Sequence, residues 1–217
     1  MSETSTLVTE QHFHYIAEHT TREDEFLREL KRAAQAAGIP SIWIAPEQAS
    51  LMQILLKLSH AKEVVEVGTL AGYSAIAMAR ALPEGGHVRT IELMPLHAEF
   101  AERWAAKSNV AGKVQVFRGA GMDVLPTFES DSADAAFLDA DKGSYPLYLK
   151  ECLRIVRRGG LIMVDNAFAF GELFSDQPSD KEVGAVRAFN EHMAKVDAVQ
   201  GIIVPIGDGL WVGVRTK

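Results

Sequence analysis

A buried strand, a glycine-containing turn and the start of a helix follow one another in EVVEVGTLAGYS, residues 63–74. The apolar run at 63–67 is typical of a strand in a parallel sheet, and Gly68 and Gly72 allow the chain to turn sharply after it. The alternation recurs: further strands are predicted at 87–92, 114–118, 134–139 and 160–165, and helices at about 73–82, 95–108, 120–126, 144–157 and 180–195. Strands that alternate with helices form right-handed βαβ units, so the sequence predicts a parallel sheet covered by helices on both faces.

The two ends of the chain depart from this alternation. Residues 9–38 hold two amphipathic helices, the second with a threonine start, and a third helix begins at Pro46. The segment QGIIVPIGDGLWVGVR (200–215) predicts two strands around a tight turn at 207–209, which form an antiparallel hairpin at the sheet edge. The expected fold class is α/β, with a Rossmann-like, doubly wound sheet of seven mostly parallel strands. We expect a single domain over 1–217, made of a helical extension (1–60) and a Rossmann-like core (61–217).

Composition and charge exclude several classes of protein. The chain has 217 residues, of which 47% are hydrophobic and 24% charged, and its net charge is −7. An acidic chain without a basic block does not predict a nucleic-acid partner. The N-terminal residues lack the pattern of a secretory signal, and no apolar run approaches the ~20 residues of a membrane span, so we expect a cytoplasmic protein with no membrane partner. The single cysteine, Cys152, excludes an internal disulfide and a cysteine-based zinc site.

Carboxylates gather where the predicted strands end, which is where ligands bind in open α/β sheets. Four of the five strand ends carry one. Polar residues commonly gather where strands leave the core, but this does not explain well the pattern Asp-x-Asp-Lys at 139–142 followed by Asp165-Asn166. Buried acids are costly unless they are paired or bind a cation. The turn at 68–72 lacks the second glycine of the dinucleotide fingerprint, which weakens the case for a nicotinamide cofactor. Glu66 enters this turn, and a carboxylate there suits an adenosine cofactor with an ammonium or sulfonium group better than a pyrophosphate. Glu92 ends the second strand, at a position suited to both hydroxyls of a ribose.

Four motifs carry a resemblance to a known family: EVGTLAGYS at 66–74, FLDADKGSYPLY at 137–148, GGLIMVDN at 159–166 and PIGDGL at 205–210. With them the chain, from about residue 9 to its end, resembles the class I S-adenosylmethionine-dependent O-methyltransferases. It is most similar to the cation-dependent family that includes catechol and caffeoyl-CoA O-methyltransferases. The combination of DADK and VDN is the specific part of this resemblance.

The resemblance implies a role for each matching residue. The amino-acid end and the ribose of S-adenosylmethionine are expected to lie against Glu66, Gly68, Gly72, Tyr73, Ser74 and Glu92, the adenine against the backbone of Ala120, and the cofactor beside Asp139 and Asp141. The implied ligands of a divalent cation are Asp139, Asp165 and Asn166, and the implied catalytic base is Lys142. Carboxylate and amide oxygens are hard ligands, which suit Mg²⁺ first and Mn²⁺ or Ca²⁺ as alternatives. The implied partners are a small aromatic substrate with vicinal hydroxyls and a second copy of the chain.

The chain also departs from the family pattern. Phe168 and Phe170 follow the Asp-Asn pair where relatives often carry a tryptophan and a polar residue, so these rings either wall an aromatic substrate or belong to the core. Ala49-Ser50 replaces the usual Gly-Gln, and the N-terminal region shows no obvious basic cluster, which favours a free catechol over a CoA ester. The irregular loop 171–181 is either a lid or a surface loop. Two alternatives stay open: a metal-independent small-molecule methyltransferase, and a non-catalytic S-adenosylmethionine-binding protein.

Overall fold

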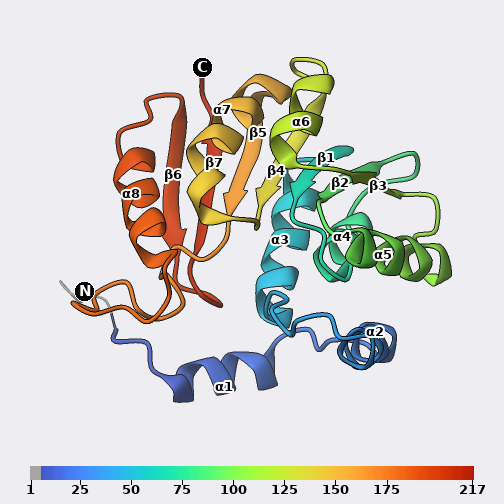
Figure 1. Cartoon of the computed structure of the whole chain (residues 1–217), viewed down its shortest axis with the longest axis horizontal. Helices are drawn as coiled ribbons and strands as arrows, with labels where there is room; N and C mark the ends of the chain where they lie inside the picture. The colour runs from blue at the N-terminus through green and yellow to red at the C-terminus, as the bar shows by residue number, and fades with distance from the viewer. Residues whose placement is uncertain (1–5) are drawn as a thin grey trace.

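A computed structural model describes residues 6–217, which fold around one seven-stranded sheet (Figure 1). The strand order is β3-β2-β1-β4-β5-β7-β6. Strands β1 to β5 pair in parallel, and β7 pairs antiparallel with both β5 and β6, which confirms the predicted fold class. The strands are β1 (Glu63–Val67), β2 (His87–Glu92), β3 (Val114–Arg118), β4 (Ala133–Leu138), β5 (Val156–Val164), β6 (Val199–Val204) and β7 (Leu210–Arg215).

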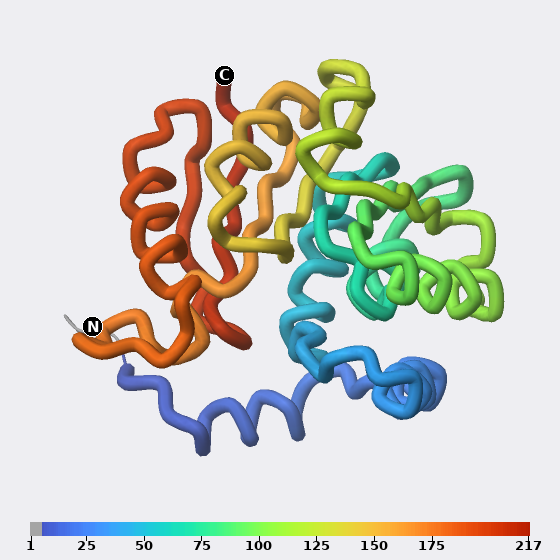
Figure 2. Tube along the Cα trace, in the orientation of Figure 1, coloured from blue at the N-terminus to red at the C-terminus, as the bar shows by residue number. Residues whose placement is uncertain are grey.

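Helices pack on both faces of this sheet, as the alternation predicts. They are α1 (Glu10–His19), α2 (Glu25–Ala36), α3 (Pro46–Leu58), α4 (Tyr73–Ala79), α5 (Pro95–Lys107), α6 (Gly121–Val124), α7 (Tyr145–Ile155) and α8 (Val183–Met193), with 3₁₀ turns η1 (Leu125–Thr127) and η2 (Lys142–Ser144). Residues of α2 to α5 share one buried apolar cluster with the sheet, and residues of α7 and α8 share another. Helix α1 holds no buried residue and lies away from the sheet (Figure 2). No helix in the described part of the chain is long and apolar enough to cross a membrane.

Several boundaries differ from the sequence prediction. Helix α2 begins at Glu25 rather than at a threonine, because the side chain of Asp24 accepts a hydrogen bond from Leu27 N and caps it. The helix predicted at 120–126 ends at Val124, since Pro126 has no N–H to continue it. The turn predicted at 207–209 is instead a five-residue connection, 205–209, between β6 and β7. Residues 1–5 of the predicted N-terminal extension lie outside the described residues.

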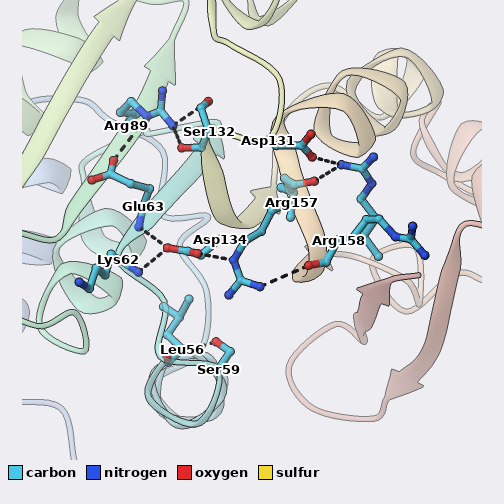
Figure 3. A network of polar contacts seen from close by, with 12 residues as sticks. Leu56, Ser59, Lys62, Glu63, Arg89, Asp131, Ser132, Asp134, Arg157 and Arg158 are labelled. Atoms are coloured by element: carbon cyan, nitrogen blue, oxygen red, sulfur yellow. Dashed lines mark hydrogen bonds and ion pairs between the residues drawn. The ribbon is translucent and has the colours of Figure 1, made fainter. Parts of the chain in front are cut away.

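A polar network ties the strands together at the end of the sheet where β1, β4 and β5 begin (Figure 3). The carboxylate of Asp134 accepts hydrogen bonds from Lys62 N at 2.7 Å, from Glu63 N at 3.0 Å and from Arg157 Nε at 2.6 Å. Burial opposes the charged carboxylate, but the bonds from Arg157 and the two backbone amides outweigh it, and the pKa of Asp134 lies below its ordinary value.

Replacement of Asp134 is therefore expected to destabilise the fold without touching the ligand-binding end of the sheet. Asp134→Ala should lower the free energy of unfolding by about 1.5–3 kcal/mol, the range for hydrogen bonds to a charged group. Because folding lowers this pKa, the contribution is full above the ordinary carboxylate pKa of about 4 and is lost as the pH falls below it. Urea unfolding of the variant and the native chain at pH 7 and at about pH 3 measures the difference. Equal stability at pH 7 would contradict this role.

Candidate active site

A cleft of 1290 Å³ opens at the carboxyl ends of the parallel strands, where the strand order reverses between β1 and β4. Open α/β sheets bind their ligands at this switch point. Most of the predicted site residues line it together: Gly68, Tyr73, Ser74, Glu92, Ala120, Asp139, Asp141, Lys142, Asp165, Asn166 and Phe170. Three predicted residues, Glu66, Gly72 and Phe168, do not line the cleft.

The glycine turn after β1 brings two strand ends into contact. Gly68 has a φ of 100°, and a Cβ atom there would lie 1.9 Å from the carbonyl oxygen of Asp139. Only glycine fits this position, because any side chain would push the ends of β1 and β4 apart. Leu70 also has a left-handed backbone, with a φ of 48°, and its N–H donates to Glu92 Oε2 at 2.8 Å. The turn therefore holds the end of β2 as well.

Glu66 is fully buried at the end of β1, directly behind Ser74. The Ser74 hydroxyl donates to Glu66 Oε1, and Glu66 Oε2 has no hydrogen-bond partner among the described residues. Burial raises the pKa of Glu66 to about 8. Because Ser74 Oγ gives its proton to Glu66, its lone pairs remain available to a donor in the cleft. The pair suits a cationic donor such as an ammonium group.

Glu92 is held at the opposite side of the turn by backbone donors. It is 7% exposed, and its two oxygens accept from Met94 N at 2.9 Å and from Leu70 N at 2.8 Å. Each carboxylate oxygen keeps a lone pair for a second donor, so a pair of ligand hydroxyls can bind here. His97 Nδ1 lies 3.6 Å from Glu92 Oε1 and also lines the cleft.

Lys142 is buried, with 5% of its surface exposed, although its loop sequence alone favours an exposed lysine. Its amine donates to the Tyr145 hydroxyl at 2.8 Å and to Asp139 Oδ1 at 3.1 Å. Burial and the nearby carboxylates of Asp139 and Asp165 raise the pKa of Tyr145 well above its ordinary value, so its hydroxyl stays protonated. The amine therefore has a fixed position in the cleft.

Asp165 and Asn166 directly follow the last residue of β5 and line the same cleft as Lys142. Asp165 is 6% exposed, and its Oδ1 accepts from Gln48 Nε2 at 2.7 Å. Burial and the Asp139 carboxylate raise the pKa of Asp165 to about 7. Asn166 takes a left-handed φ of 63°, and its Nδ2 donates to Asp208 Oδ2 at 3.0 Å. Within residues 6–217, no three histidine, cysteine, aspartate or glutamate side chains form a metal-binding group. The predicted set differs because it has two carboxylates and one amide.

The two phenylalanines after Asn166 have different surroundings. Phe170 lines the cleft, is 42% exposed and has its ring centroid 5.9 Å from Lys142 Nζ. The Phe168 ring instead packs beneath Gly209, where a Cβ atom would lie 2.8 Å from it. Ala169 and Phe170 have φ values of 54° and 59°, so the chain turns and the two rings do not share a face.

Several residues that line the cleft, or contact a side chain that lines it, were not predicted from the sequence. Tyr145 and Tyr148 lie within the quoted motif FLDADKGSYPLY, three and seven residues after the side chains that they contact. Burial raises the pKa of Tyr148 to about 12, and its hydroxyl donates to Asp141 Oδ1 at 2.7 Å. Asp208 lies within PIGDGL, whereas nothing in the sequence marks Gln48 or His97 as site residues.

Comparisons with known proteins identify the family of the chain. A family model described as O-methyltransferase matches residues 17–216. A catechol O-methyltransferase of Niastella koreensis is 36% identical over 205 residues, which cover 93% of this chain and 90% of that protein. An O-methyltransferase from Bacillus cereus, solved in complex with SAH, has a TM-score of 0.84 at 30% identity, with 94% of this chain and 96% of that chain covered. The O-methyltransferase TomG from Streptomyces achromogenes, solved with SAM, has a TM-score of 0.83 at 31% identity, with 94% and 96% covered. Because the family model and these relatives match nearly its whole length, this chain belongs to the O-methyltransferase family.

Proposed function

We propose that this enzyme transfers the methyl group of S-adenosylmethionine to a hydroxyl of a catechol-like aromatic substrate, with a divalent cation as cofactor. One observation carries the proposal: Lys142 with Asp139, and Asp165 with Asn166, face the same cleft as the glycine turn and Glu92. Relatives that are named catechol O-methyltransferases support the substrate class.

The glycine-turn side of the cleft fits the methyl donor. Ser74, backed by Glu66, is placed to accept from its ammonium group, and Glu92 is placed to accept from its ribose hydroxyls. Gly68 and Gly72 have no side chain to occupy the space of the methyl donor. Tyr73, Ala120 and Asp141 line the remaining surface of this part of the cleft.

Loss of Glu92 is expected to weaken binding of S-adenosylmethionine. Glu92→Ala should make the free energy of S-adenosylmethionine binding less favourable by on the order of 1–3 kcal/mol, because charge-assisted hydrogen bonds to the ribose hydroxyls are lost. Isothermal titration calorimetry measures the change, with circular dichroism to establish that the variant is folded. Glu102→Ala is the matched control, because Glu102 is a half-buried carboxylate on α5 that pairs with Arg118 and does not line the cleft. Unchanged affinity in folded Glu92→Ala would remove Glu92 from the site.

The other side of the cleft fits a hard cation, which Asp139, Asp165 and Asn166 would hold. Two carboxylates that face one cleft, one of them almost fully buried, repel each other, and a bound cation relieves that repulsion. We favour Mg²⁺, with Mn²⁺ and Ca²⁺ as alternatives. When bound, the cation supplies Lewis-acid stabilisation of negative charge on oxygen.

The residues of the chain then perform the proton transfer and the positioning. Lys142 Nζ takes the proton of the reacting hydroxyl, while Asp139 and Tyr145 keep the amine in place. Phe170 walls the aromatic ring of the substrate. The substrate oxygen forms a bond to the methyl carbon as the bond from that carbon to sulfur breaks, so the gain in rate comes mainly from alignment.

The charge of the cleft favours a free catechol over a CoA ester. The described lining carries seven carboxylates, and its basic groups are Lys31, Lys142 and His97. The structure does place Arg28, Lys31 and Arg32 together on α2, a basic cluster that sequence analysis did not find. These side chains pair with Glu23 and Glu25, which leaves them poorly suited to bind phosphates.

A methyl-transfer assay tests the proposed function. The chain is incubated with S-adenosylmethionine, Mg²⁺ and a panel of catechols, and the methylated product is detected by mass spectrometry. Methylation that survives EDTA would favour the metal-independent alternative. Binding of S-adenosylmethionine without turnover of any substrate in the panel would favour the non-catalytic alternative.

We further propose that residues 1–217 act as one methyltransferase domain and that the protein forms a homodimer. Helix α1 supports the second point, because it holds no buried residue within its own chain. Light scattering on the purified protein measures the mass, and a monomeric mass would contradict the dimer.

A further inference from the structure

The connection between β6 and β7 reaches the candidate cation site, although it lies far from it in the sequence. Asp208 Oδ2 accepts from Asn166 Nδ2 at 3.0 Å and from Phe170 N at 2.8 Å, and its Oδ1 accepts from Gly171 N at 3.2 Å. Asp208 thus contacts an implied cation ligand and the backbone that follows it. We call residues 166–171 the strap and residues 205–209 the hairpin connection.

Backbone contacts join the same two segments. Within the strap, Ala167 N donates to Gly209 O and Phe168 N donates to Asp208 O, both at 2.8 Å. Three non-glycine residues of the strap have a left-handed backbone, with φ between 54° and 63° at Asn166, Ala169 and Phe170. Such conformations are strained in non-glycine residues and persist only where surrounding contacts impose them. The Asp208 side chain supplies three contacts to the strap: two with the backbone, at Phe170 N and Gly171 N, and one with the side-chain amide of Asn166.

We propose that Asp208 is a positioning residue for the cation site. A side-chain amide that donates through Nδ2 to Asp208 turns its Oδ1 away from that carboxylate, and Asn166 lines the cleft. The hydrogen bond therefore selects the amide orientation in which oxygen, and not nitrogen, is available to a cation. Through Phe170 N, Asp208 also holds the strap that carries the Phe170 ring toward Lys142.

Gly207, next to Asp208, packs against the hydrogen-bond partner of Asp165, a second implied ligand of the cation. A Cβ atom on Gly207 would lie 2.1 Å from Gln48 Oε1, and Gln48 Nε2 donates to Asp165 Oδ1. The hairpin connection therefore borders both Asn166 and the partner of Asp165. Residues that orient metal ligands typically change affinity by about 10–100-fold when replaced.

Binding of Mn²⁺ to the full chain, followed by electron paramagnetic resonance, tests this inference, which rests on the proposed cation site. Asp208→Ala is expected to raise the Kd for Mn²⁺ by about 10–100-fold. Asp208→Asn, which is nearly isosteric, keeps an acceptor for Asn166 but loses the charge, so its Kd should rise by only about threefold. If Asp208→Ala does not fold, an unchanged Kd in Asp208→Asn would overturn the proposal by itself.

Two further variants separate positioning from loop order. Glu172→Ala is the matched control, because the Glu172 carboxylate accepts hydrogen bonds from Ser179 and Asp180 in the adjoining loop and contacts no implied ligand. The Kd of this variant for Mn²⁺ should equal that of the native chain. In the Asn166→Ala background, Asp208→Ala should cost little further affinity, since the positioned group is gone. Equal losses in Glu172→Ala and Asp208→Ala, or full additivity with Asn166→Ala, would overturn the proposal.

The same titrations distinguish failure of this inference from failure of the proposed function. If the native chain binds no Mn²⁺, the cation site itself is wrong, and this inference falls with it. If the native chain binds Mn²⁺, Asp139→Ala does not, and Asp208→Ala binds like the native chain, only the role of Asp208 is wrong. Affinity for S-adenosylhomocysteine, measured without metal, should be the same in all folded Asp208 variants.

Discussion

Lys142→Met is expected to lower kcat by roughly 10²–10⁴-fold, the usual scale for loss of a general base, while affinity for S-adenosylmethionine is retained. Methionine keeps the length and apolar stem of the side chain but lacks the amine that lies 2.8 Å from the Tyr145 hydroxyl and 3.1 Å from Asp139. Initial rates of methyl transfer at saturating substrate measure kcat, and calorimetry measures cofactor binding.

Lys150→Met is the matched control, because Lys150 is an exposed lysine on α7 outside the cleft. Its kcat should equal that of the native chain. Near-normal turnover in Lys142→Met would reduce Lys142 from the base to a residue that orients Asp139. A loss of cofactor binding in the same variant would show that burial of Lys142 serves the fold of the cleft more than the chemistry.

Removal of the cation is expected to abolish activity, and addition of Mg²⁺ or Mn²⁺ to restore it. Asp139→Ala should cause the same loss irreversibly, because it removes an implied ligand and the partner of Lys142. Asp123→Ala, an exposed carboxylate of α6 that does not line the cleft, should keep full activity.

The substrate provides an independent test of the same site. A catechol offers two adjacent oxygens to the cation, whereas a monophenol offers one and is held less firmly. Misplacement of this kind costs about 10²-fold in rate, so a catechol should react far faster than the matching monophenol. Initial rates on such a pair, with and without EDTA, measure both effects. Equal rates that EDTA does not change would contradict the cation-dependent mechanism and leave only the cofactor-binding half of the proposal.

Local sequence patterns predicted most of the elements because their causes are local. The strand at 63–67 is an apolar run that ends in a glycine turn, and the helix at Pro46 begins with a proline at its first turn. Boundaries were predicted less well where a single contact sets them, as with Asp24 at the start of α2. The hairpin was predicted, but its five-residue connection was not, since glycines at 207 and 209 fit turns of several lengths.

The sequence by itself determined the alternation of strands and helices and the position of a carboxylate at most strand ends, because periodicity and turn residues act over a few neighbours. Only the tertiary structure decided which of those groups meet. Gln48 and Asp165 are 117 residues apart in the chain and share a hydrogen bond, and Asp208 reaches Asn166 across 42 residues. The burial of Lys142 and the separation of the Phe168 and Phe170 rings likewise depend on how distant segments pack. Such contacts follow from the strand order and from a few left-handed backbone positions, which a pattern of neighbouring residues does not specify.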